Sequence, residues 1–137
     1  MTYADCITDA LRMIGVLSLY ESADADQGTH GLMILNDMMA KWESDGIMVG
    51  YAQNADLSAD LNLAPIARQA VKQNLAIQLC PTYGRQPSAI LVASADTGLS
   101  MLNMNAAVGL QQEADLRDVP RGSGRGGRLD ITSGRIV

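Results

Sequence analysis

Few residues of this 137-residue chain could carry out acid–base or metal chemistry. His30 is the only histidine, so a site with several histidine ligands is excluded, and a Ser-His-Asp arrangement would depend on this one ring. We expect His30 to face solvent. Cys6 and Cys80 lie far apart without a C-x-x-C spacing, which predicts buried, reduced thiols from a reducing compartment such as the cytoplasm. The sequence therefore predicts no catalytic residue, no metal site and no cofactor.

Carboxylates are the one abundant reactive group, with fifteen acidic residues against ten basic ones. Glycoside hydrolysis needs only a pair of carboxylates, so a peptidoglycan hydrolase is one alternative hypothesis. With three glutamates and twelve aspartates, such a pair could exist. The acidic residues are interpreted more simply as a solvated surface.

The segment 122–127 spells G-x-G-x-x-G, the fingerprint of dinucleotide-binding proteins. It follows no predicted strand and opens no predicted helix, and both are needed to place a pyrophosphate at a helix N-terminus. The match is therefore attributed to glycine-rich composition.

Charge divides the chain into two parts. Residues 1–116 hold thirteen acids and five bases, a net charge of −8, whereas residues 117–137 hold five arginines and two aspartates, a net charge of +3. The Gly/Arg-rich arm of residues 109–137 cannot build a core of its own and is expected to be disordered in the free chain and ordered by a partner. The predicted partner-binding residues are Arg117, Arg121, Arg125, Arg128, Leu129, Ile131, Arg135, Ile136 and Val137.

The arm admits two kinds of partner. Arginines pair with phosphates, so a nucleic-acid-binding protein is a second alternative. However, the arm has no aromatic residue for base stacking and the whole chain is acidic, so a protein surface that bears carboxylates is favoured. Residues 129–132 and 135–137 could add as short strands to the edge of a partner's sheet.

The composition predicts an all-α fold. Phenylalanine is absent, and Ala, Leu, Ile and Met supply most of the apolar residues. We expect a four-helix domain over residues 1–108, with a long extended loop and the extended C-terminal arm. No apolar run approaches the roughly 20 residues that span a bilayer, so no membrane partner is expected.

Apolar residues recur at helical spacing in four segments. The first helix is predicted over residues 3–14, with a capping box formed by Thr2 and Asp5. The second runs from a Ser22 cap to Gly46, and Gly28 and Gly31 could bend its first half or delay its start to Thr29.

A third, central helix is predicted from Ile66 to Cys80, apolar on more than one side. A fourth starts at Pro87 or Ser88, repeats Val92, Ala95, Leu99 and Leu102 on one face, and fades near Asn105. The predicted core residues are Leu11, Leu35, Met38, Trp42, Leu75, Leu79, Leu99 and Leu102.

The eighteen residues 47–64 show short apolar patches and no helical period. We interpret them as an extended excursion used for contacts, because apolar side chains are costly to leave in water.

Three blocks of the sequence resemble a known family. They are A-L-R-M-I-G-V-L (10–17), L-N-D-M-M-A-K-W-E-S-D-G (35–46) and N-L-A-I-Q-L-C-P-T-Y-G (74–84). In this order they are similar to the head-to-tail adaptor, or tail accessory, proteins of short-tailed bacteriophages. Cys80 stands where an alanine is common in the family.

The resemblance implies a structural virion protein without enzymatic activity. Such proteins form a twelve-membered ring beneath the portal and clasp portal subunits with a C-terminal extension. The implied partners are the portal protein, neighbouring copies, and tail or nozzle proteins, with DNA passing through the channel without sequence-specific contact. The implied location is the head–tail junction of a virion assembled in the host cytoplasm. An acidic body suits such a channel, because like charge keeps the duplex from sticking to the wall.

Overall fold

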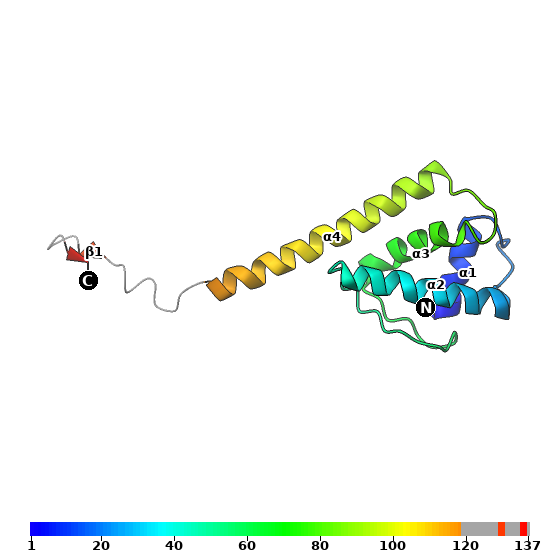
Figure 1. Ribbon diagram of the computed structural model, residues 1–137, viewed down its shortest axis with the longest axis horizontal. Helices are drawn as coiled ribbons and strands as arrows, with labels where there is room; N and C mark the ends of the chain where they lie inside the picture. The colour runs from blue at the N-terminus through cyan, green and yellow to red at the C-terminus, as the bar shows by residue number, and fades with distance from the viewer. Residues whose placement is uncertain (119–128, 131–134, 137) are drawn as a thin grey trace. The chain divides into compact units, whose positions relative to one another are not determined.

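The computed structural model describes residues 1–118, 129–130 and 135–136, and the side chains of residues 1–107. The helices and strands of these residues, in chain order, are α1 (Tyr3–Met13), α2 (Ala25–Ser44), α3 (Pro65–Leu79), α4 (Ala89–Asp118), β1 (Leu129–Asp130) and β2 (Arg135–Ile136) (Figure 1). The chain divides into two compact units, Met1–Ala106 and Ala107–Val137. We call the first unit the body. The all-α fold of four helices with a long loop is confirmed.

The helix α1 begins at the predicted capping box. The backbone N–H of Asp5 donates to Oγ1 of Thr2 at 3.1 Å, and the N–H of Thr2 donates to the Asp5 carboxylate at 2.9 Å. These two bonds satisfy donors that have no partner inside the helix. The apolar face of α1 is fully buried and packs against α2 and α3.

The helix α2 is capped by Asp24, so the prediction of a Ser22 cap is wrong. The N–H of Gln27 donates to the Asp24 carboxylate at 2.8 Å, and the Gln27 side-chain oxygen accepts from the Asp24 N–H at 3.1 Å. Asp24 has a capping partner three residues later, which is the arrangement that closes a capping box. The helix ends just before Gly46, whose φ of +87° is the left-handed conformation expected of a terminating glycine.

The prediction that α2 could start as late as Thr29 is wrong, because α2 is helical from Ala25. Its two glycines instead leave room for side chains of neighbouring segments. A Cβ atom added at Gly31 would lie 2.5 Å from Cγ2 of Ile7, and one at Gly28 would lie 2.9 Å from Cδ1 of Leu57. Real Cβ atoms do not approach other atoms so closely. Glycine at these positions therefore lets α1 and the loop after α2 lie directly on the α2 backbone.

The helix α3 starts with Pro65 at its first position, where the missing N–H costs no hydrogen bond. It packs against α1 and α2. It also meets α4 where Gly98 lies so close to Ala70 that a Cβ would be 2.9 Å from the alanine methyl. Ile66 was expected on an apolar face but is 54% exposed in the first turn of α3.

The helix α4 is longer than predicted. Ser88 caps it by accepting from the Leu91 N–H at 3.2 Å, as expected, but the helix continues past Asn105 to Asp118. Residues 106–118 are mostly good helix formers, and Gly109 costs only about 1 kcal/mol against alanine, so one glycine does not end the helix. Val92 was expected on the core face but is 43% exposed.

The loop 47–64 is part of the core. Ile47, Val49, Leu61 and Leu63 are each at most 6% exposed. The loop also pairs with the start of the chain, because the Leu61 N–H donates to the Met1 carbonyl at 2.8 Å and the Ala4 N–H donates to the Leu57 carbonyl at 3.0 Å. The extended loop closes the body from one side.

The burial of Trp42 yields the first prediction. Its side chain is 5% exposed in the core, so Trp42→Ala should lower the free energy of unfolding by about 3–5 kcal/mol. Urea denaturation measures the change. Tyr20→Ala, at a residue that is 94% exposed, is the control and should be nearly neutral. A Trp42→Ala protein that melts within about 2 °C of wild type would contradict this packing.

The contact at Gly31 yields a second prediction. Helix propensity alone would make Gly31→Ala stabilising by about 1 kcal/mol. The overlap with Ile7 should reverse the sign and destabilise the protein by about 1–3 kcal/mol. Ser100→Ala, on the exposed side of α4, is the control. A stabilised Gly31→Ala protein in urea denaturation would show that α1 does not pack so closely on α2.

Candidate partner-binding site

The structure describes four of the nine predicted partner-binding residues. Arg117 lies next to the end of α4, and Leu129, Arg135 and Ile136 lie in the two short strands. The remaining five, Arg121, Arg125, Arg128, Ile131 and Val137, lie outside the described residues, as does the glycine-rich segment 122–127.

The two strands of the arm pair with each other in antiparallel register. Leu129 is opposite Ile136, and Asp130 is opposite Arg135. The prediction that these segments add to the edge of a partner's sheet stays a prediction; in the described chain the two strands pair with each other. Sequence reasoning missed this pairing because the strands are only two residues long and carry no clear alternation.

The predicted core residues all lie in the body. Leu11, Leu35, Leu75 and Leu79 are fully buried, and Met38, Trp42 and Leu102 are at most 6% exposed. Leu99 is half-buried and packs against this core. These residues fix the body and leave little of their surface for a partner.

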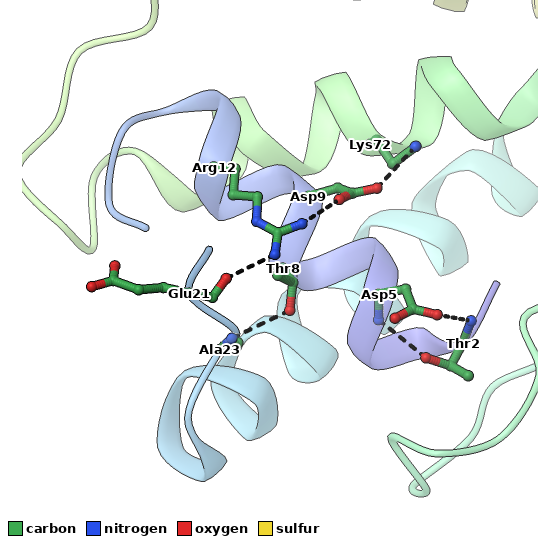
Figure 2. Close-up of polar contacts among 8 residues, drawn as sticks. All are labelled: Thr2, Asp5, Thr8, Asp9, Arg12, Glu21, Ala23 and Lys72. Carbon is green, nitrogen blue, oxygen red and sulfur yellow. Dashed lines mark hydrogen bonds and ion pairs between the residues drawn. The ribbon is translucent and has the colours of Figure 1, made fainter. Parts of the chain in front are cut away.

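An ion-pair cluster links α1 to α3 and to the connector, residues 14–24, between α1 and α2 (Figure 2). The Asp9 carboxylate lies 3.3 Å from the Arg12 guanidinium and 3.1 Å from the Lys72 ammonium. Arg12 also donates to the Glu21 carbonyl at 2.8 Å. The spacing of Asp9 and Arg12 on one helix was visible in the sequence, whereas no sequence signal brings Lys72 to them.

The titratable groups with shifted pKa values are explained by local structure. The backbone N–H of Thr2, followed by its side chain, lowers the pKa of Asp5, and the Ser58 hydroxyl, followed by its N–H, lowers the pKa of Asp56. Burial raises the pKa of the Cys6 thiol to about 12. Cys6 is therefore a neutral, buried thiol, as predicted, and not an activated nucleophile.

His30 is half-buried rather than fully solvent-facing. Its Nε2 atom lies 3.1 Å from the Thr82 hydroxyl, so the ring has a hydrogen-bond partner on the turn after α3.

Among the described residues, no group of three His, Cys, Asp or Glu side chains could hold a metal ion. None of the described helices is long and apolar enough to cross a membrane.

A small pocket of about 150 Å³ lies between α2 and the loop 47–64. Its lining includes Met39, Met48, Tyr51 and a single carboxylate, that of Glu43. A glycosidase requires a pair of carboxylates about 5–10 Å apart. The described lining of this pocket does not supply that pair, so it gives the hydrolase hypothesis no support.

Taken together, the described residues form a helical body stabilised by packing, caps and one ion-pair cluster, followed by a separate C-terminal unit. The described residues thus define an all-α protein of four helices with a long extended loop. The family model of the P22 tail accessory factor matches residues 1–133, and the chain belongs to that family. It is a structural protein of a bacteriophage tail and a component of the virion, and the predicted resemblance is confirmed.

The capping box of α1 yields a third prediction, on pH dependence. Because the folded state lowers the pKa of Asp5, its contribution to stability is present above 3.8, the ordinary pKa of the group, and is lost as the pH falls through the folded-state pKa. Asp5→Asn should therefore destabilise the protein at neutral pH, and the difference from wild type should shrink in acid. Thr2→Ala should cost about 1 kcal/mol at neutral pH.

Urea denaturation at a series of pH values measures both effects. Asp37→Asn, on the exposed side of α2, is the matched control. If the difference between Asp5→Asn and wild type stayed constant down to the lowest pH, the carboxylate would not act as the cap.

Proposed function

We propose that this tail protein is a head-to-tail adaptor. Twelve copies form a ring under the portal, extend the DNA channel and join the portal to the tail or nozzle proteins, and the ring assembles in the host cytoplasm at the head–tail junction. Family membership supports this proposal, together with one structural observation: the chain separates into a body and a C-terminal unit that begins within α4. An adaptor needs such a division, because one part builds the ring and another reaches its neighbour.

The arm, residues 109–137, is the proposed portal-binding element. Its first residues continue α4 to Asp118, and its last residues form the β1–β2 pair. The five arginines from Arg117 onward can form charge-assisted hydrogen bonds with carboxylates on the portal. The apolar residues Leu129, Ile131, Ile136 and Val137 supply burial. The loop 47–64 is a weaker candidate, because most of its apolar residues are already buried inside the body.

In a ring, many weak contacts with the portal act together and raise the overall affinity. Each arm residue that becomes ordered only on binding costs about 1–2 kcal/mol in backbone entropy, so a single arm binds weakly. Once several copies are joined, later attachments become intramolecular, and avidity rises by about 10²–10⁴ without any new kind of contact. The isolated chain is therefore expected to be largely monomeric and to assemble steeply with concentration.

The charge of the body fits a channel for DNA. Residues 1–106 contain eleven acids and five bases, a net charge of −6. Repulsion between these acids and phosphates disfavours stable contacts, so DNA passes without sequence-specific binding.

A truncation series provides the fourth prediction. Chains ending at Asp118 and at Ala106 keep the body intact and remove the arm in two steps, so both should melt near the wild-type temperature. We expect both to lose most of their binding to purified portal rings in co-sedimentation. A full-length variant in which Arg121, Arg125 and Arg128 become Gln should bind more weakly than the matched Lys variant, and wild-type binding should weaken with salt. If the chain ending at Ala106 bound portal rings as well as wild type, the arm would not be the clasp and the loop 47–64 would take its place.

A further inference from the structure

A groove runs between α3 and α4 in the body, with a volume of about 410 Å³. Its floor lies where Ala70 and Gly98 bring the two helices together, and small residues such as Ser94 keep it open. Its walls include Ile66 and Met101, which are 54% and 50% exposed. Two large apolar side chains thus border a hollow that nothing in the described chain fills.

The lining of this groove carries no charged side chain, although the body as a whole is strongly acidic. Two copies of the body repel each other wherever their acids meet, and the repulsion is smallest across an uncharged surface. The groove is therefore a part of the body that a second copy can approach at low electrostatic cost. The side-chain amides of Gln69 and Gln73 offer hydrogen-bond donors and acceptors at its edge.

The connector between α1 and α2 carries two exposed apolar side chains. Leu19 is 73% exposed and Tyr20 is 94% exposed, an unusual placement for two adjacent large apolar residues. The turn that carries them is fixed, because the Ser18 N–H donates to the Glu21 carboxylate at 2.9 Å and the Glu21 N–H donates to the Ser18 carbonyl at 3.2 Å. Arg12 holds the same turn from α1 (Figure 2). A projection already held in place loses little entropy on binding.

We propose that the Leu19–Tyr20 projection of one copy inserts into the α3/α4 groove of a second copy. In Figure 1 the connector lies at the opposite end of the body from the first turns of α3, so one copy offers the projection and the groove at different places. A contact between two different surfaces is heterologous, which is the kind that generates rings. Tyr20 is the anchor, with its ring in the groove and its hydroxyl at the amides of Gln69 and Gln73. This inference rests on the proposed ring and names the surfaces that would join its neighbours.

Cross-linking of single-cysteine variants tests the contact without the portal. Ser22→Cys places a thiol two residues after Tyr20, and Ser94→Cys places one in the groove. The natural Cys6 and Cys80 are buried, so wild type gives the background. With a short bismaleimide, a mixture of the two variants should give a cross-linked dimer, and each variant alone should give far less. Ser44→Cys and Ser100→Cys, exposed on other parts of α2 and α4, replace each partner in turn as matched controls.

Removal of the anchor should strongly reduce the yield of cross-linked dimer. Tyr20→Ala in the Ser22→Cys protein should lower the dimer yield about tenfold, as expected for an aromatic anchor at an interface. Met48→Ala removes another exposed apolar side chain and should leave the yield unchanged. The proposal is overturned if the mixture gives no more dimer than the controls, or if Tyr20→Ala has no effect on the yield.

The result is separable from the proposed function. Dimer formation together with failure to bind portal would remove the adaptor role and leave this contact standing. Portal binding without dimer formation would keep the adaptor role and remove this contact between copies.

Discussion

The close approach of α1 to α2 at Gly31 is the contact on which the rest of the body depends. Ile7 occupies the space that any side chain at position 31 would need, which brings the buried face of α1 against the Trp42 helix. With α1 fixed there, its first turn becomes the edge on which the loop 47–64 pairs, and Asp9 is placed to meet Lys72 of α3. The absence of one Cβ atom thus allows three long-range contacts. Such an interior is close-packed, so the addition or loss of a single methyl group changes its stability.

This packing also explains how the protein can serve as an assembly unit. The sequence suggested the loop 47–64 as a segment for contacts, but Ile47, Val49, Leu61 and Leu63 of this loop are buried in the core. Our proposals assign partners to three places: the arm, the α3/α4 groove and the Leu19–Tyr20 turn. In our account the arm reaches the portal, and the other two join neighbouring copies. We propose that a body that is stable by itself is added to a ring copy by copy.

Local features of the sequence predicted local structure well. The capping box at Thr2 and Asp5 and the buried stripe through Leu35 and Trp42 depend on spacings of three and four residues, which helix geometry alone decides. Errors arose where two local signals competed or where tertiary contact decided. Asp24 was preferred to Ser22 because Gln27 completes its capping box, and α4 continued through Gly109 because one glycine is a small penalty. The Asp9–Lys72 pair joins residues 63 positions apart and could not be read from spacing.

Hydrogen exchange of the full-length protein, alone and bound to portal rings, tests the central claim most directly, namely that the body is preformed and the arm makes the attachment. Amides of α1, α2, α3 and the loop 47–64 should be protected already in the free chain and should change little on binding. New protection should appear in residues 109–137, with smaller gains at the Leu19–Tyr20 turn and along the α3/α4 groove. New protection confined to the loop 47–64, with the arm unchanged, would contradict the account.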